Sequence, residues 1–384
     1  MRIEKLDEHI KALATLEPSD APVISCYLDV STGPSGYRTV LDERVHLLRR
    51  SLPREDMGNF EEAFTRIEEF LGTGVALVTR GIAVFARGGR HPLFLALQFE
   101  VPLPIWIAVD STPNLYHLVE LKDNYDRYAI LQVTENSARI IGINLGSVTD
   151  QIWKNRPELR HRVGRGWARD HFQDHRRERN NQFVHDLIGI LANVMATGGY
   201  GHLILAGSTR ALVAVKKALP KSLAVKLVDV VPASANDRIS DVVTTTLQRF
   251  LEHEELDSQA IAEQLVGQIY THGLAVAGTQ TSMQALKAGQ VDVLVIAKDY
   301  DPGNGWECRR CGKTDTQSAQ PDACPACRSH HLRGYEIRSE LVRLAGQLGC
   351  GVEVVEHSDP LMNLGGVGCL LRFLAPERYS SQAA

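Results

Sequence analysis

The chain has 384 residues, 44% of them hydrophobic, and a formal net charge of −4 at pH 7. This length exceeds one typical core, so we expect two or three domains in a soluble globular protein. The near-neutral charge excludes a protein that coats nucleic acid over its whole surface, although it permits a local basic patch. No apolar run approaches the roughly 20 residues of a membrane span, and the N-terminus is charged rather than signal-like. We therefore expect a cytoplasmic protein without a membrane partner.

The first expected domain covers residues 1–125 and has an α/β pattern. Pro22–Val30 is rich in β-branched and aromatic residues, which predicts a strand. Residues 39–52 space their apolar side chains along one face of a helix. The two apolar runs of residues 74–89, separated at Arg80-Gly81, predict a β-hairpin.

The second expected domain, residues 126–235, begins with two strands over Tyr128–Leu145. A basic, glycine-containing stretch follows, and a helix with one apolar stripe is expected from about Arg177. Gly201–Gly207 is predicted to be a short buried strand, and another helix and strand complete the domain. This alternation of strands and helices implies a parallel element in the sheet.

The third expected domain, residues 236–384, contains two helical stretches, then a strand, a helix and the buried strand Val291–Ala297. A cysteine-rich module at about residues 303–333 follows, and after it a helix over Ile337–Leu348 and two final strands. The module interrupts an α/β domain, so we expect it to protrude as an insertion. The whole chain is thus predicted to be an α/β protein of three domains in series. Mixed sheets flanked by helices and a zinc ribbon inserted in the third domain complete this prediction.

Four of the seven cysteines form the most specific motif, Cys308-x2-Cys311-x12-Cys324-x2-Cys327. Each Cys-x2-Cys turn can direct two thiolates to one centre, and the spacer returns the second pair to complete a tetrahedron. Zinc suits four thiolates, and a closed ligand set leaves no position for substrate or water. We therefore predict a structural zinc ion, whose binding supplies folding energy to a module too small for a core of its own.

Other interpretations of this motif stay open. The cysteines can be reduced and unliganded, His330 or His331 can replace one of them as a ligand, or a Cys-x2-Cys pair can be redox-active. Redox pairs usually occur singly and begin a helix of a thioredoxin-like fold, which two pairs in one small insertion do not match. The paired spacing and the odd number of cysteines favour a metal in a reducing compartment.

The segment of residues 156–179 concentrates eight arginines and three histidines against four acidic residues. Its glycines permit backbone conformations that other residues resist, its arginines offer planar donors to phosphate, and its tryptophan can stack on a base. The candidate RNA-binding residues are Arg160, Arg162, Gly164, Arg165, Gly166, Trp167, Arg169 and His171. By spacing alone, a solvated charged segment leading into a helix explains the pattern equally well.

The order of these parts resembles the archaeo-eukaryotic class-1 release factors and their relative Pelota, in the bacterial branch of that family. Five segments spread over most of the chain carry the resemblance: PVISCYLDV at 22–30, GRGWARDHFQDHRRERNNQFVHDL at 164–187, HLILAGS at 202–208, GTQTSMQALKAGQVDVLVIA at 278–297 and LGGVGCLLRF at 364–373. The paired Cys-x2-Cys is similar to the zinc module of archaeal members. Five segments in the family's order are more specific than any one of them alone.

The resemblance implies binding in the ribosomal A site, with the three domains directed to the decoding centre, the peptidyl-transferase centre and partners that include a translational GTPase. Release factors of this family use the glutamine of a Gly-Gly-Gln motif to position water against the peptidyl-tRNA ester. Here Gly164-Arg165-Gly166 continues into Trp167-Ala168-Arg169, and none of these side chains can orient water with an amide. The nearest glutamine, Gln173, falls where a helix is expected to begin, and the Asn-Ile-Lys-Ser motif of stop-codon reading is absent.

We therefore expect a non-enzymatic translation factor that occupies the A site of vacant or stalled ribosomes, in hibernation or rescue. Its expected partners are the phosphates of rRNA or tRNA, held by the Arg/Gly loop, and an elongation-factor GTPase that delivers it. A peptidyl-tRNA hydrolase or peptide release factor with a divergent catalytic loop is the alternative. An adaptor whose zinc module binds another protein is a third interpretation.

Overall fold

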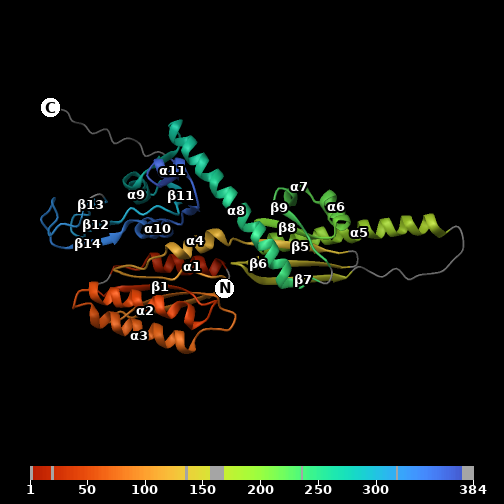
Figure 1. The fold of residues 1–384 in the computed structure, drawn as a ribbon. Coiled ribbons are helices and arrows are strands. Elements are labelled where there is room, and N and C mark those ends of the chain that lie inside the picture. The colour runs from red at the N-terminus through yellow and green to blue at the C-terminus, as the bar shows by residue number, and fades with distance from the viewer. Residues whose placement is uncertain are drawn as a thin grey trace. The chain divides into compact units, whose positions relative to one another are not determined.

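A computed structural model describes residues 3–18, 21–134, 137–155, 168–234, 237–316 and 319–373. It has two compact units, one formed by residues 3–124 together with the chain from Glu255 onward, the other by residues 125–254 (Figure 1). Both contain β-sheets flanked by helices, which confirms the predicted α/β class with mixed sheets. The predicted division at residues 125/126 and 235/236 into three domains stays a prediction.

The first sheet of the larger unit is antiparallel, with the strand order β3-β2-β1-β4. Its strands and the two helices on its buried face are β1 (Val23–Asp29), β2 (Gly81–Arg87), β3 (Leu93–Phe99), β4 (Trp106–Asp110), α2 (Pro34–Ser51) and α3 (Met57–Thr73). The predicted hairpin over residues 74–89 is wrong. Only its second run forms a strand, β2, which pairs with β1 and β3, and Leu77 in the first run is fully exposed.

The second sheet of this unit has the order β10-β16-β11-β15 and mixes parallel and antiparallel pairs. It consists of β10 (Ala275–Ala277), β11 (Val291–Ala297), β15 (Gly351–Val355) and β16 (Val367–Leu371), with α9 (Thr279–Lys287), α10 (Ile337–Leu348) and α11 (Asp359–Asn363). β11 is the predicted buried strand and α10 the predicted helix, both with the expected bounds. Two helices, α1 (Ile3–Ala14) and α4 (Tyr116–Asn124), pack against α10.

A small sheet of order β13-β12-β14 is inserted between β11 and α10, as the sequence predicts for the cysteine module. Its strands are β12 (Asn304–Cys308), β13 (Thr314–Asp315) and β14 (Leu332–Glu336). The buried cluster of this ribbon consists of Trp306 and two of the cysteines, Cys308 and Cys324, with Leu332 and Cys327 packed against it. So small an apolar cluster is too little to stabilise the ribbon, which agrees with a need for a metal.

The second unit is a five-stranded sheet of order β7-β6-β5-β8-β9. Its strands are β5 (Tyr128–Val133), β6 (Ser137–Asn144), β7 (Ser147–Asn155), β8 (His202–Gly207) and β9 (Leu227–Pro232). β5, β8 and β9 run parallel to one another, which confirms the predicted parallel element. β6 pairs antiparallel with β5 on one side and with β7 on the other. β7 is a strand that the sequence did not predict.

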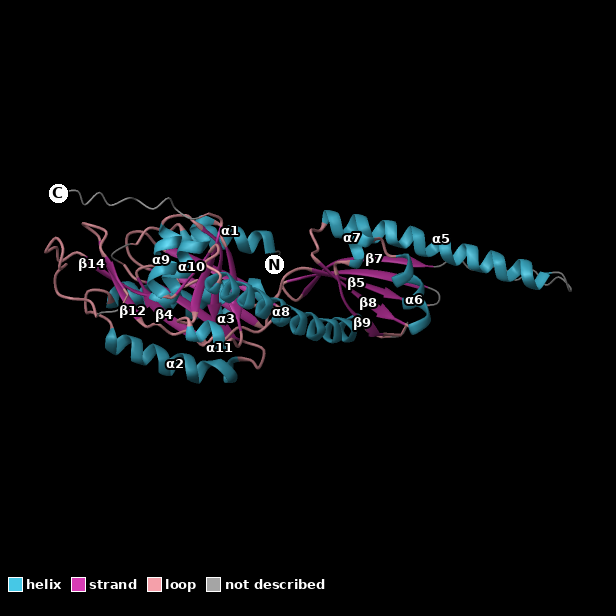
Figure 2. Ribbon diagram, turned by 90° about the horizontal axis from the view of Figure 1, so that it is seen from above, coloured by secondary structure: helices cyan, strands magenta, loops and turns pink. Residues whose placement is uncertain are grey.

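Helices cover both faces of this sheet. One face packs against α5 (Ala168–Thr197), α6 (Thr209–Ala218) and α7 (Lys221–Ala224), and the other against the first half of α8 (Ile239–Tyr270). Among the side chains of α5 that the structure describes, the buried ones begin at Phe183 and end at Met195. The backbone of the earlier turns of α5 continues past the sheet, as both views show (Figures 1 and 2). This helix starts at Ala168, nine positions before the Arg177 that was expected.

Candidate metal centre and basic segment

The four cysteines of the paired motif meet at one point of the ribbon. Their sulfur atoms all lie within 4.8 Å of one another. The Sγ atoms of Cys308 and Cys327 are 3.5 Å apart, and those of Cys311 and Cys324 are 3.6 Å apart. Four thiolates at about 2.3 Å from a tetrahedral zinc ion would be separated by about 3.8 Å. The cluster therefore has the size and the donor set of a four-coordinate metal site.

Two equivalent backbone turns produce this convergence. In each, the residue after the second cysteine has a positive φ, 70° at Gly312 and 58° at Arg328. In each, its backbone N–H donates to the carbonyl of the first cysteine, at 2.9 Å from Gly312 to Cys308 and 2.8 Å from Arg328 to Cys324. Glycine adopts this conformation without steric cost, whereas Arg328 does so against its preference. The local chain geometry thus directs each pair of thiols inward.

The electrostatic surroundings of Cys308 favour the thiolate that a metal needs. Burial alone would raise the pKa of this thiol, but the backbone N–H groups of Cys311 and Arg310 and the Cys327 thiol outweigh it and lower the pKa to about 6. The pKa of Cys324 is lowered in the same way, against the effect of burial, by the backbone N–H groups of Cys327 and Ala326. Both deeply buried cysteines are therefore poised to bind as thiolates.

The two histidines after the motif are placed outside the cluster of sulfur atoms. The Nδ1 atom of His330 lies 2.9 Å from the carbonyl oxygen of Asp322, to which it donates. The backbone N–H of His331 donates to Ser329 Oγ at 3.2 Å. Among the described residues, the ligand atoms that gather within 4.8 Å here belong to the four cysteines. This geometry favours four thiols over a site in which histidine replaces one of them.

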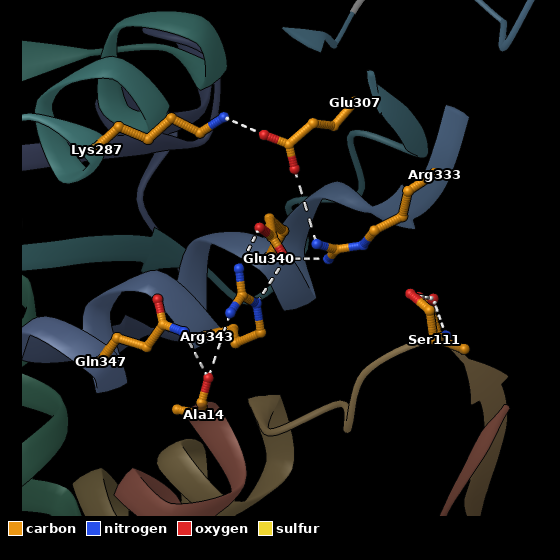
Figure 3. A network of polar contacts seen from close by, with 9 residues as sticks. Ala14, Ser111, Lys287, Glu307, Arg333, Glu340, Arg343 and Gln347 are labelled. Atoms are coloured by element: carbon orange, nitrogen blue, oxygen red, sulfur yellow. Dashed lines mark hydrogen bonds and ion pairs between the residues drawn. The ribbon is translucent and has the colours of Figure 1, made fainter. Parts of the chain in front are cut away.

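A buried ion network joins the ribbon to the helices beside it (Figure 3). The carboxylate of Glu340 on α10 accepts from Arg343 Nε at 2.8 Å and Arg343 Nη2 at 2.6 Å, and from Arg333 Nη2 of β14 at 2.7 Å. Arg333 also reaches Glu307 of β12 at 3.8 Å, and Glu307 pairs with Lys287 of α9 at 3.4 Å. Two strands of the ribbon are thereby tied to α9 and α10.

The same network reaches the N-terminal helix. Arg343 Nη1 and Gln347 Nε2 both donate to the carbonyl oxygen of Ala14, at 3.3 Å and 2.7 Å, at the C-terminal end of α1 (Figure 3). Burial alone would raise the pKa of Glu340, but the hydrogen bonds and charge of Arg343 and then Arg333 outweigh it and hold that pKa below its usual value. Glu340 is therefore an ionised carboxylate between two buried guanidinium groups.

A cleft of about 1340 Å³ lies in the larger unit, between the ribbon and the first sheet. Basic side chains line it from both sides, Arg90 after β2 and Arg309 and Arg333 of the ribbon, and carboxylates such as Glu55 and Asp110 line it as well. Its mixed charge selects neither anions nor cations. No local sequence pattern indicated this cleft, because its two walls lie about 200 positions apart in the chain.

The structure leaves most of the predicted RNA-binding residues outside its description. Those outside the described ranges are Arg160, Arg162, Gly164, Arg165, Gly166 and Trp167. Arg169 and His171 lie in the first turns of α5, where the backbone alone is described. The segment therefore leads directly into the end of α5 that extends past the sheet, and contact with RNA stays a prediction.

A family model for "Bacterial archaeo-eukaryotic release factor family 10" matches residues 113–250, which run from α4 into α8. The curated protein "Peptide chain release factor subunit 1" of Thermococcus sibiricus is 26% identical over 141 residues, which cover 32% of this chain and 34% of that protein. The matched part thus spans about a third of the length of this relative.

Solved structures of the same group align over much of the chain at low identity. Archaeoglobus fulgidus Pelota is 12% identical, with a TM-score of 0.36, over 96% of this chain and 92% of that one. Dom34 of S. cerevisiae, described as a termination-like factor that interacts with Hbs1, is 11% identical, with a TM-score of 0.40, over 77% and 82%.

The part of the chain that resembles release factors is thus the second unit, with its mixed five-stranded sheet and long α5, together with the residues just before and after it. The match of residues 113–250 to family 10 of the bacterial archaeo-eukaryotic release factors agrees with the predicted resemblance to the bacterial branch. Within the ranges that the structure describes, no helix has the length and apolar character to cross a membrane.

Proposed function

We propose that this protein is a translation factor that binds in the A site of vacant or stalled ribosomes, in hibernation or rescue, without releasing peptide. The observation that carries the proposal is a release-factor family match over residues 113–250 in a chain whose corresponding loop reads Gly-Arg-Gly-Trp-Ala-Arg. Release by this family depends on an amide that orients water, and Trp167, Ala168 and Arg169 have none. In this proposal the protein has the central domain of a release factor but lacks the amide side chain that orients water for peptide release.

The position of α5 supports the same proposal. Because α5 begins at Ala168, the backbone at Gln173 is already in the second turn of a helix. A glutamine there is not part of the glycine-containing loop that precedes the helix. The nearest amide side chain thus lacks the loop position that the family's release chemistry requires.

The arginines of the loop have a non-catalytic role in this proposal. Arg162 and Arg165 of the loop and Arg169 at the start of α5 bind phosphates of rRNA or tRNA through planar, paired donors, and Trp167 stacks on a base. An elongation-factor GTPase delivers the protein to the ribosome. The four-cysteine centre holds a structural zinc ion, because its ligand set is closed and its sulfur separations match zinc. Binding to ribosomes places the protein in the cytoplasm.

Sedimentation with purified vacant ribosomes, with and without a translational GTPase, tests the binding. The wild-type protein should pellet with ribosomes at moderate salt, and absence from the pellet in both conditions would refute the proposal. Replacing Arg162, Arg165 and Arg169 by alanine should reduce the slope of log K against log salt by about 2 to 3, since each phosphate contact contributes about 0.7 to 0.9. The matched variant with three lysines keeps the charge and should keep most of this slope.

Release of labelled peptide from ribosome-bound peptidyl-tRNA tests the absence of chemistry. The protein should release no more peptide than buffer does. Release that is lost in Gln173→Ala would establish the alternative, a peptidyl-tRNA hydrolase or release factor with a divergent loop.

A further inference from the structure

The second unit has a basic surface on α6 and α7 that is separate from the Arg/Gly loop. From Ser208 to Val228 the chain contains five cations and no acidic residue, although the whole protein has a net charge of −4. Four of these cations, here called the α6–α7 face, are exposed: Arg210, Lys216, Lys217 and Lys221. The fifth, Lys226, donates to the carbonyl of Tyr200 at 2.8 Å.

The packing of α6 explains why these cations face outward. Leu212 and Val215 are buried against the sheet with the residues of α5. On a helix of 3.6 residues per turn, Arg210 and Lys217 lie opposite this buried side. Among the described residues, none of the four cations of the α6–α7 face forms an ion pair. No carboxylate in the described part of the chain therefore neutralises their charge through an ion pair.

The spacing of these charges indicates the kind of partner. Arg210 and Lys217 are seven residues apart on one side of α6, about 10 Å along the helix axis. One phosphate ion cannot contact both, whereas a chain of phosphates can, since a nucleic-acid strand carries one charge per about 3.4 Å of duplex axis. A membrane surface fits less well, because an interfacial helix needs a free apolar side and the apolar side of α6 is buried in the core.

We propose that the α6–α7 face is a second RNA-binding surface, which contacts a phosphate backbone without reading its sequence. The inference rests on the proposed function in taking RNA as the nucleic acid. α6 packs against α5, and both cover the same side of the sheet (Figure 2). The α6–α7 face and the long helix that follows the Arg/Gly loop are thus neighbouring parts of one unit.

Binding of the full-length protein to a labelled 20-base-pair RNA duplex of arbitrary sequence, followed by fluorescence anisotropy from 50 to 200 mM salt, tests this inference without ribosomes. The variant Arg210→Gln/Lys217→Gln/Lys221→Gln should bind at least tenfold more weakly at 50 mM salt. Loss of three duplex contacts should also reduce the slope of log K against log salt by about 2.7. These side chains are exposed and form no ion pair with the described residues, so the variant should keep the fold, which its thermal midpoint checks.

The matched control is Lys5→Gln/Lys11→Gln/Arg54→Gln, which removes the same charge from exposed positions of the other unit. It should keep the wild-type affinity within about twofold.

The inference is overturned if both triple variants weaken binding equally, because net charge then explains the effect. It is also overturned if the α6–α7 variant binds RNA like the wild-type protein, or loses binding to anionic phospholipid vesicles while its RNA affinity is unchanged. If the α6–α7 variant loses binding to the RNA duplex but still sediments with ribosomes, the inference holds and ribosome binding does not depend on this face. If the wild-type protein binds the RNA duplex but does not sediment with ribosomes, the proposed function is refuted and the inference is not.

Discussion

Glu340 is the residue whose loss should weaken the larger unit most directly. Its side chain is 4% exposed and accepts three hydrogen bonds from two arginines that are themselves 6% and 8% exposed. Replacement by glutamine keeps the shape but removes the carboxylate that Arg333 and Arg343 share, and Arg333 then retains the longer contact of 3.8 Å with Glu307. Breaking a buried pair in this way costs about 3–5 kcal/mol. Part of that cost falls on the contact of Arg343 with Ala14, and so on the packing of α1.

Urea unfolding followed by tryptophan fluorescence measures this effect. Trp306 is 1% exposed in β12, next to the affected strands, and so reports on the ribbon. With a slope of about 3 kcal/mol per M, the predicted loss moves the transition down by about 1–2 M urea. The control is Asp292→Asn, which removes an exposed pair with Arg372 at 3.1 Å, and surface pairs of this kind contribute only about 0–1 kcal/mol. Equal transitions for Glu340→Gln and Asp292→Asn would refute the reasoning.

The dependence on pH gives a second test of the same carboxylate. The pKa of Glu340 is lower in the folded protein than in the unfolded chain, where it is about 4.3. Its contribution to the free energy of unfolding is therefore fully present above about pH 4.3 and disappears as the pH falls through the folded value. The difference between wild type and Glu340→Gln should be constant from pH 7 to 5 and should shrink below pH 4.3. A difference that grows on acidification would contradict this sign.

Two further predictions concern the ribbon and the central sheet. Cys308→Ser should abolish metal binding, which mass spectrometry would show as a fall from about one zinc per chain to none, and the tryptophan emission should shift to the red. The control Cys350→Ser lies outside the cluster and should keep the metal. Equal metal contents in the two variants would contradict the site. Gly207→Ala should lower the free energy of unfolding by about 3 kcal/mol, because its Cβ would lie 2.0 Å from the Val133 carbonyl oxygen. In the control Gly201→Ala, the added Cβ meets nothing within 4 Å, so the free energy of unfolding should stay within about 1 kcal/mol of the wild-type value. A larger loss of this free energy in Gly201→Ala than in Gly207→Ala would show that the clash with Val133 is not the cause.

Local sequence patterns predicted the elements whose structure depends on neighbouring residues. The bounds of β11 and α10 agree with the expectation, since each combines a complete period of apolar residues with clear ends. The metal cluster was predicted from spacing because each Cys-x2-Cys turn closes within five residues. The hairpin at residues 74–89 failed for the opposite reason. Two apolar runs beside a glycine give the same sequence pattern whether they pair with each other or with distant strands. Here the second run, β2, pairs with β1 and β3.

The sequence by itself determined the α/β class, the four clustered cysteines, the concentration of arginines over residues 156–179 and the absence of Gly-Gly-Gln, because each is a property of residues close together in the chain. Only the tertiary structure decided that Arg333, Glu340 and Arg343 share one buried network with Ala14, more than 300 positions away. It also decided that Leu212 and Val215 point inward, which turns Arg210 and Lys217 to the surface. Such pairings follow from long-range packing of apolar faces, and the period of a helix shows that it has a buried side without showing what lies against it.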